Sequence, residues 1–125
     1  MKINKLNRSN IKNQIPCIIW FTGLSGAGKS TVADLLEQKL NRIKKHTFLL
    51  DGDNLRNGLT KDLGFSPEDR MENIRRIAEV GSLFSYAGCI VIISLISPYN
   101  SERKKARAIR PEIFKEVYVK ASLEK

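Results

Sequence analysis

Hydrophobic residues along the chain fall into short continuous runs separated by longer stretches of mixed polarity. Residues 17 to 21 (CIIWF) and residues 90 to 96 (IVIISLI) are continuous apolar runs, and residues 47 to 50 (TFLL) combine β-branched, aromatic and aliphatic side chains. Runs of this length and composition predict β-strands, and residues 116 to 119 (EVYV) predict a fourth one. A strand without polar alternation is typical of a parallel sheet, in which both faces are buried.

The stretches between these runs show the features of helices: apolar residues at helical spacing, and residues that begin or end a helix. Apolar residues of the first stretch recur three and four positions apart, at Val32, Leu35, Leu36 and Leu40. A second helix is predicted from Ser66 as N-cap and Pro67 as first helical residue to residue 87, closed by Gly88. A third, basic helix follows the residue 90 to 96 run and ends at Pro111. Alternating strands and helices predict an α/β fold, with a parallel sheet flanked by helices on both sides.

A glycine-rich turn joins the first strand to the first helix. Residues 23 to 30 (GLSGAGKS) match the phosphate-loop pattern G-x-x-x-x-G-K-[ST], with the strand before it and the helix after it that this motif requires. The glycines let successive N–H groups point into one concavity at the positive end of a helix, which suits a polyphosphate. Lys29 adds a charge for the β- and γ-phosphates, and the Ser30 hydroxyl is placed to ligate Mg²⁺. We therefore expect a nucleoside triphosphate here.

Two acids follow the second strand, at Asp51 and Asp53. Because the carboxyl ends of parallel strands face one crevice, these acids are expected near the phosphate loop, together with the segment that starts at Ser97. Acids beside a triphosphate can hold Mg²⁺ directly or through water, and one can accept the proton of an attacking hydroxyl. The alternative is that they only form a turn and cap it. We favour the functional interpretation, since both acids lie where a magnesium complex is expected.

The net charge of +9 is concentrated in two segments. Residues 1 to 15 contain four basic residues and no acid, and residues 101 to 110 contain five basic residues and Glu102, so each segment contributes +4. We interpret the first as a flexible tail and the second as a solvated helix face. Neither contains aromatic residues that could stack on bases, so no specific nucleic-acid partner is expected.

Length and composition indicate the number of domains and the cellular location to expect. The 125 residues are enough for one domain, predicted over residues 16 to 125 after the tail. No apolar run approaches the roughly 20 residues that cross a bilayer, and the N-terminus lacks the apolar core of a secretory signal. A cytoplasmic protein without a membrane partner is therefore predicted. Its two cysteines, Cys17 and Cys89, are expected to be free thiols.

Several segments together resemble the adenylyl-sulfate kinase family. They are residues 21 to 30 (FTGLSGAGKS), 50 to 56 (LDGDNLR), 62 to 66 (DLGFS), 69 to 76 (DRMENIRR) and 96 to 99 (ISPY). The resemblance extends from about residue 18 to residue 125, and the later segments make it more specific than a phosphate loop alone. It implies a P-loop NTPase-type fold that uses ATP and Mg²⁺ to phosphorylate the 3′-hydroxyl of adenylyl sulfate, giving 3′-phosphoadenylyl sulfate for sulfate assimilation.

The same resemblance implies roles for individual residues. ATP would be held by Gly23, Leu24, Ser25, Gly26, Ala27, Gly28, Lys29, Ser30 and Thr31. Catalysis would involve Lys29, Asp51, Asp53 and Ser97, and Mg²⁺ would be held by Ser30 and Asp51. The adenylyl sulfate site would be formed by Asp53, Arg56, Phe65, Arg70, Asn73, Ile96 and Ser97.

The residue types implied for the adenylyl sulfate site suit this ligand, because an adenine can lie against Phe65 and guanidinium groups match phosphate and sulfate oxygens. There are simpler alternatives. Arg70 and Arg75 could be surface charges paired with Glu72 or Glu79, and Phe65 could be a core residue. Ser97 matches a position described in the family as a phosphoserine intermediate. It could equally be a turn residue or cap, because in-line transfer between bound substrates needs no covalent step.

The resemblance also implies segments that this sequence does not contain: a further helix, a basic lid, an adenine-contacting stretch, a last strand and a C-terminal helix. We therefore expect a partial kinase domain with slow turnover, whose fourth strand is an exposed edge open to association, for example as a homodimer. One alternative is a nucleotide-binding fragment without turnover. Another is a different small-molecule kinase on the same fold, which the DGDN and ISPY segments disfavour.

Overall fold

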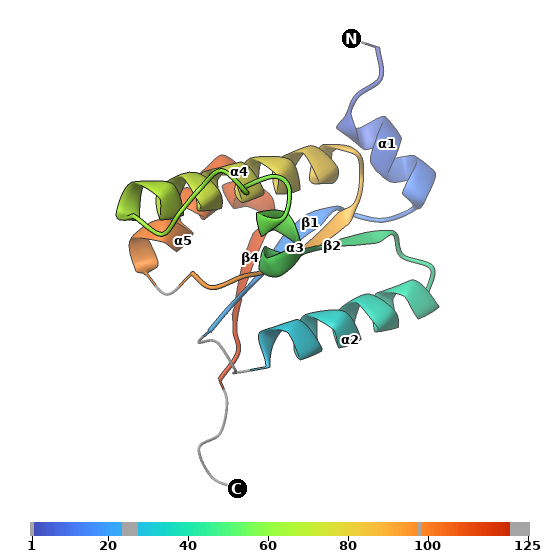
Figure 1. Ribbon diagram of the computed structural model, residues 1–125. Coiled ribbons are helices and arrows are strands. Elements are labelled where there is room, and N and C mark those ends of the chain that lie inside the picture. Colours follow the sequence, from blue (N-terminus) through green and yellow to red (C-terminus); the bar gives the residue numbers. More distant parts are fainter. Residues whose placement is uncertain (1, 24–27, 98, 121–125) are drawn as a thin grey trace, which may run out of the picture.

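The four predicted strands form one fully parallel sheet. A computed structural model describes residues 2–23, 28–97 and 99–120, with only the backbone described at Asp53 (Figure 1). The sheet has the order β2-β3-β1-β4. Its strands are β1 (Cys17–Thr22), β2 (Thr47–Asp51), β3 (Ile90–Ser94) and β4 (Phe114–Tyr118). All five residues of β3 are buried, as the unbroken apolar run predicts. Within the described residues, β2 and β4 are the edge strands.

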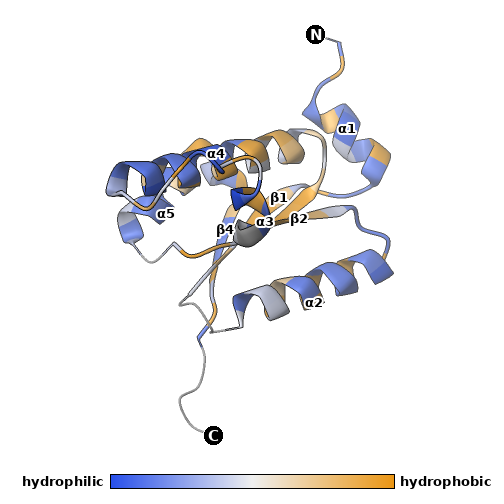
Figure 2. Cartoon of the chain, in the orientation of Figure 1, coloured by the Kyte–Doolittle hydropathy of each residue, from blue (hydrophilic) through white to orange (hydrophobic). Residues whose placement is uncertain are grey.

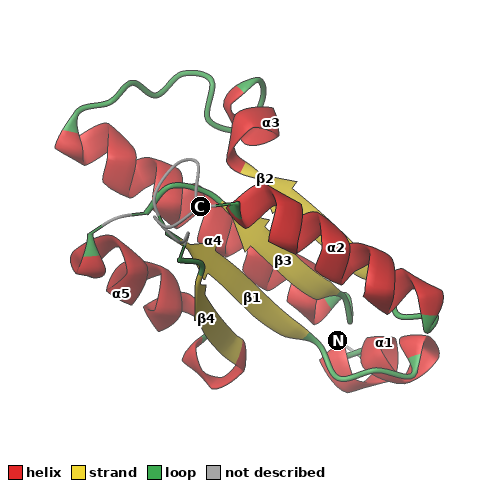
Figure 3. Ribbon diagram, turned by 90° about the horizontal axis from the view of Figure 1, so that it is seen from below, coloured by secondary structure: helices red, strands yellow, loops and turns green. Residues whose placement is uncertain are grey.

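Helices cover both faces of the sheet, which confirms the predicted α/β class. Helix α2 (Lys29–Arg42) lies on one face, while α4 (Pro67–Tyr86) and α5 (Asn100–Ile109) lie on the other (Figures 1 and 3). The predicted start of α4 is confirmed, because the Ser66 hydroxyl accepts a hydrogen bond from the Asp69 N–H at 3.1 Å. No described helix has the length and apolar character needed to span a membrane.

Side chains along the central strands alternate between two hydrophobic layers. In β1, Ile18 and Trp20 belong to the core beneath α4 and α5, whereas Phe21 belongs to the core beneath α2. Figure 2 shows the corresponding concentration of apolar residues on the strands and polar residues on the outer helix surfaces. The predicted apolar side of α2 is only partly correct. Its inner face is formed by Ala33, Leu36 and Leu40, whereas Val32 and Leu35 are exposed.

Several element boundaries differ from the prediction, and one short helix was not predicted. Strand β3 ends at Ser94 rather than residue 96, because it pairs with β1 and β2 only as far as Phe21 and Asp51. Strand β4 begins at Phe114, two residues before the predicted start. The turn considered as an alternative after β2 is instead a short helix, α3 (Gly52–Arg56), which packs Leu55 against the core. A 3₁₀ turn, η1 (Pro111–Ile113), connects α5 to β4.

The predicted N-terminal tail contains a helix, α1 (Lys5–Lys12), that contacts α4. The Gln14 amide just beyond it donates to the backbone oxygens of His46 at 2.9 Å and Gly88 at 2.7 Å. Gly88 has φ +91°, and a Cβ there would lie 3.0 Å from the Arg8 carbonyl oxygen. Helix α1 is therefore held at the end of the sheet where β2 and β3 begin. The division of the chain at residue 15 stays a prediction. Cys17 and Cys89 are free, as expected.

Candidate active site

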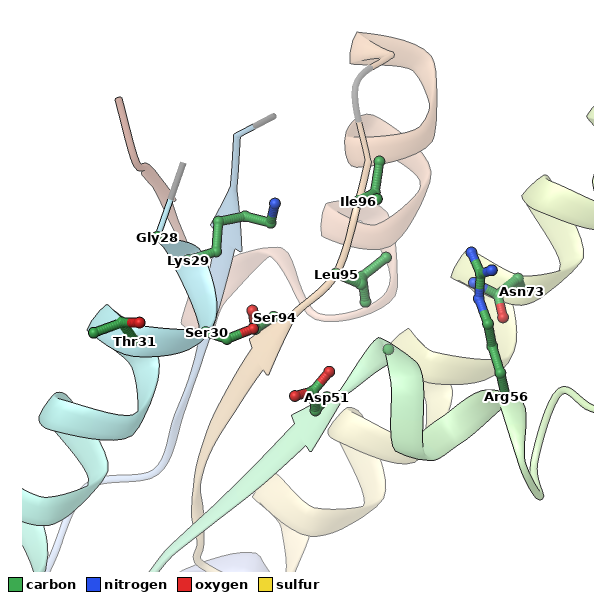
Figure 4. A pocket seen from close by; sticks show the side chains of 11 residues that line it. Gly28, Lys29, Ser30, Thr31, Asp51, Arg56, Asn73, Ser94, Leu95 and Ile96 are labelled. Atoms are coloured by element: carbon green, nitrogen blue, oxygen red, sulfur yellow. The ribbon is translucent and has the colours of Figure 1, made fainter. Parts of the chain in front are cut away.

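A cavity of about 280 Å³ opens where β2, β3 and the start of α2 meet (Figure 4). It lies at the carboxyl ends of the strands, where ligands bind in open parallel sheets. Phosphate-loop residues and the acid at the end of β2 share it, as predicted. Its lining residues are Gly28, Lys29, Ser30, Thr31, Asp51, Gly52, Arg56, Asn73, Ser94, Leu95 and Ile96.

The described parts of the phosphate loop have the backbone that the motif requires. Gly23 has φ +142°, and a Cβ there would lie 2.5 Å from the carbonyl oxygen of Val119. Gly28, with φ +94°, precedes the first residue of α2. The positive end of that helix therefore borders the cavity, which favours a phosphate group. The predicted ligands Leu24, Ser25, Gly26 and Ala27 lie outside the described residues.

Lys29 is the buried cation of this cavity. Its Nζ donates to the Gly23 carbonyl oxygen at 3.0 Å, and burial lowers the pKa of the amino group. A cation shielded from water interacts more strongly with a phosphate than a cation on the surface does. This position suits the predicted role of Lys29, which is to provide a positive charge for the β- and γ-phosphates.

Side chains with oxygen atoms that could ligate a metal ion line the same cavity as Lys29. The Ser30 hydroxyl, the Asp51 carboxylate and the Ser94 hydroxyl all line the cavity, and Asp51 is paired in register with Ser94. Hydroxyl and carboxylate oxygens are ligands that Mg²⁺ prefers, so the predicted pair Ser30 and Asp51 fits this ion. Within the described residues, no group of three or more histidine, cysteine, aspartate or glutamate residues gathers as a metal cage. Mg²⁺ here would take its remaining ligands from phosphates and water.

A second cavity, of about 350 Å³, adjoins the first. Arg56, Asn73 and Ile96 line both of them. The residues around it come from α3, α4, α5 and the segments that precede α4 and α5: Arg56, Phe65, Arg70, Asn73, Ile74, Ile96, Tyr99 and Glu102. All residues of the predicted adenylyl sulfate site with described side chains lie here, except Ser97. The side chain of Asp53 is not described. Ile74, Tyr99 and Glu102 were not predicted as site residues.

Two arginines in this cavity stack on aromatic rings. Arg56 Cζ lies 5.0 Å from the Phe65 ring centroid, and Arg70 Cζ lies 4.6 Å from the Tyr99 centroid. Phe65 is 74% exposed, so the alternative of a core residue is wrong. Arg70 pairs with Glu102 at 3.1 Å rather than with either glutamate considered from sequence.

The segment that carries Phe65 is tied to α4 by polar contacts. Asp69 Oδ2 accepts from the Gly64 N–H at 2.7 Å. Farther along α4, Arg76 donates to Asp62 at 2.7 Å and to the Leu59 carbonyl oxygen at 3.1 Å. These contacts fix one wall of the second cavity relative to the helix that provides Arg70.

Glu72 accepts hydrogen bonds from Arg76, which also binds Asp62, and from Arg75 on the exposed side of α4. Arg75 and Arg76 both donate to its carboxylate, and they lower its pKa from 4.5 to about 2. Arg75 thus forms the surface pair expected from sequence. The folded pKa lies below the unfolded one, so Glu72 stabilises the protein above pH about 4.5, and this contribution is lost as the pH falls towards about 2.

We therefore expect Glu72→Gln to reduce the free energy of unfolding at neutral pH, by an amount that shrinks in acid. Urea unfolding of both proteins across this pH range measures the difference. Glu68→Gln, which removes an exposed charge from the first turn of α4, is the control. A difference in unfolding free energy that does not change with pH would contradict the lowered pKa of Glu72.

Ser97 lies apart from both cavities. The residue is fully buried, and its Oγ accepts a hydrogen bond from Trp20 Nε1 at 3.1 Å. Its backbone oxygen accepts from Arg103 at 2.7 Å and from the Thr22 hydroxyl at 3.3 Å. This geometry favours the alternative that Ser97 is a turn residue joining β3 to α5. A phosphoserine at this position stays a prediction that the arrangement does not support.

Comparisons with known proteins identify relatives of the whole chain. A family model described as adenylylsulphate kinase matches residues 15–125. The chain is 54% identical over 123 residues to an adenylyl-sulfate kinase of Vibrio cholerae, covering 98% of this chain and 57% of that protein. It is also 54% identical over 125 residues to the bifunctional enzyme NodQ of Rhizobium meliloti, covering 99% of this chain and 20% of that protein.

The fold is similar to that of a solved relative. The structure of the Mycobacterium tuberculosis APS kinase CysC in complex with AMPPNP and APS matches with a TM-score of 0.82 and 45% identity, covering 87% of this chain and 65% of that chain. The chain spans less than two thirds of the length of each of these three relatives. The family model nonetheless extends over nearly all of it, which confirms the resemblance noted from the motifs. The chain belongs to the adenylyl-sulfate kinase family.

Proposed function

We propose that the protein transfers the γ-phosphoryl group of ATP to the 3′-hydroxyl of adenylyl sulfate. The observation that carries the proposal is the adjoining pair of cavities, which share Arg56, Asn73 and Ile96. One contains the groups that hold a triphosphate, and the other contains arginines and an exposed aromatic ring. A relative solved with AMPPNP and APS adds support for the two ligands.

In the proposed reaction, the 3′-oxygen of adenylyl sulfate forms a bond to the γ-phosphorus of ATP. The bond from that phosphorus to the β–γ bridging oxygen breaks, and ADP leaves with the electron pair. The hydroxyl proton passes to a carboxylate, for which Asp51 at the end of β2 and Asp53 in α3 are the candidates. Lys29 and the N-terminus of α2 stabilise charge on the phosphoryl oxygens.

Ser30 and Asp51 are the residues that would hold Mg²⁺. The ion, when bound with ATP, supplies charge neutralisation on the β- and γ-phosphates. Ser94 lines the same cavity and extends the set of oxygen donors beyond those expected from sequence. We also infer a cytoplasmic location for this ATP-dependent reaction.

The second cavity would hold the acceptor nucleotide. Phe65 offers a ring face for the adenine, and Arg56 and Arg70 offer several donors for phosphate and sulfate oxygens. Asn73 and Ile96 would contact both substrates, since both residues line the two cavities. The acceptor hydroxyl would therefore approach the triphosphate directly where the two cavities meet, and in-line transfer needs this proximity.

Phe65→Ala tests the acceptor site. Stacking of one base on an aromatic side chain contributes about 1–3 kcal/mol, so the variant should bind adenylyl sulfate about 5- to 150-fold more weakly. Its affinity for an ATP analogue should not change. Isothermal titration measures both affinities, and Leu83→Ala, another exposed apolar residue of the chain, is the control.

An assay for 3′-phosphoadenylyl sulfate, run on the same preparations, separates the candidate functions. Formation of this product supports the kinase. Tight binding of both ligands without product supports the nucleotide-binding alternative. Absence of adenylyl sulfate binding, with ATP binding intact, would contradict the proposed acceptor and support another small-molecule kinase.

A further inference from the structure

Glu102 is a buried acid in a region that otherwise carries basic residues. It is the third residue of α5, its side chain is 5% exposed, and it lines the second cavity. Burial of a carboxylate is costly unless the charge is paired and hydrogen-bonded. Its position in the first turn of a helix offsets part of that cost, and an ion pair with Arg70 offsets more.

Arg70 is held from two sides. Its Nη2 donates to Glu102 Oε2 at 3.1 Å, and its guanidinium carbon lies 4.6 Å from the Tyr99 ring centroid. Glu102 and Tyr99 are themselves joined, since the Glu102 N–H donates to the Tyr99 carbonyl oxygen at 3.1 Å. The beginning of α5 thus forms a clamp for a side chain that comes from α4.

The clamp leaves Arg70 available to a ligand. The arginine side chain is 37% exposed, whereas the glutamate that holds it is nearly inaccessible. A guanidinium group has five N–H donors, and the hydrogen bond to Glu102 uses one of them. An arginine already fixed in place loses less rotamer freedom on binding an anion than one that is free to move.

We propose that Glu102 is a positioning residue that holds Arg70 against Tyr99 for recognition of the acceptor's anionic group. The inference rests on the proposed function for the identity of that acceptor. Two simpler roles give different expectations. If Glu102 only repelled the anion, its neutralisation would strengthen binding. If it only tied α5 to α4, its neutralisation would lower stability and leave relative affinities unchanged.

The test is Glu102→Gln, which keeps the size of the side chain and removes its charge. We expect adenylyl sulfate to bind about tenfold more weakly, as for a weakened charge-assisted hydrogen bond, with the affinity for an ATP analogue unchanged. In an Arg70→Gln background the same substitution should have little effect, because the group that it positions is gone. Glu79→Gln, which neutralises a 54% exposed partner of Arg75, is the matched control.

A crystal structure of the ligand-free Glu102→Gln variant separates this inference from the proposed function. Arg70 should leave the Tyr99 ring in that structure, and an unmoved Arg70 would overturn the inference whatever the wild-type protein binds. Equal loss of both ligands, tighter acceptor binding, or an undiminished effect in the Arg70→Gln background would also overturn it. Failure of the wild-type protein to bind adenylyl sulfate would overturn the proposed function instead.

If Glu102→Gln does not fold, Glu102→Asp serves the same purpose, because it keeps the charge and shortens the side chain by one methylene. Its adenylyl sulfate affinity should fall by less than tenfold while ATP analogue binding is retained. Unchanged affinity for adenylyl sulfate in this variant would count against the positioning role.

Discussion

Replacement of Lys29 by alanine should weaken ATP binding by roughly ten- to a hundredfold. The substitution removes a charge-assisted contact to the phosphates, which contributes about 1.5–3 kcal/mol. The upper part of this range is expected, because Lys29 is only 7% exposed and its charge is poorly screened by water. Isothermal titration with a non-hydrolysable ATP analogue and Mg²⁺ measures the change directly.

Lys39→Ala is the matched control for this experiment. Lys39 lies on the same helix in its last turn, where it is exposed, and it lines neither cavity. The control should bind the ATP analogue as the unmodified protein does. Equal affinities of Lys29→Ala and the control would show that the triphosphate binds elsewhere.

The largest loss of stability is expected for Trp20→Ala. Trp20 is completely buried in the middle of β1, and its ring centroid lies 5.6 Å from that of Phe114. Truncation of a buried aromatic residue costs about 3–5 kcal/mol, through lost burial and the cavity that remains. Domains of this size are stable by only about 5–15 kcal/mol, so the variant should lose a large share of its stability. Urea unfolding followed by circular dichroism gives the difference.

Trp20→Phe divides this loss into two contributions. The phenylalanine keeps most of the apolar volume but cannot donate the hydrogen bond that Trp20 Nε1 makes to Ser97 Oγ. Leaving a buried hydroxyl without its donor costs about 1–3 kcal/mol, so this variant should be intermediate in stability. If Trp20→Phe were as unstable as Trp20→Ala, the hydrogen bond rather than the packing would carry the effect.

Most secondary structure of this protein could be predicted because its signals are local. The apolar run of β1 and the Ser66 and Pro67 pair at the start of α4 each act through their own neighbours in sequence. The phosphate loop is local too, since a glycine turn between a strand and a helix needs no distant residue to be recognised. Hence Lys29 and Ser30 could be assigned before the fold was known.

Features that depend on distant contacts were not predicted. The apolar run from residue 90 continues to residue 96, but β3 ends at Ser94 because its neighbours in the sheet no longer pair with it. Val32 and Leu35 have helical spacing and yet remain exposed, because the inner face of α2 is set by its contact with the sheet. The helix α1 within the predicted tail is likewise held by contacts near Gly88, far along the chain.

The amino-acid sequence was enough to predict the α/β class and a phosphate-binding loop, and its family resemblance named five of the eight residues that line the second cavity. The surroundings of each residue depend on how the chain folds. Ser97 is 77 positions from the tryptophan whose indole binds its hydroxyl, so no local pattern could reveal its burial. Glu102 looked like one acid in a basic segment until α5 was placed beside α4, which brought it to Arg70 across 32 positions. The physical reason is the same in both cases: periodicity reports the nearest turns of the chain, whereas burial and charge pairing are properties of segments that meet only after folding.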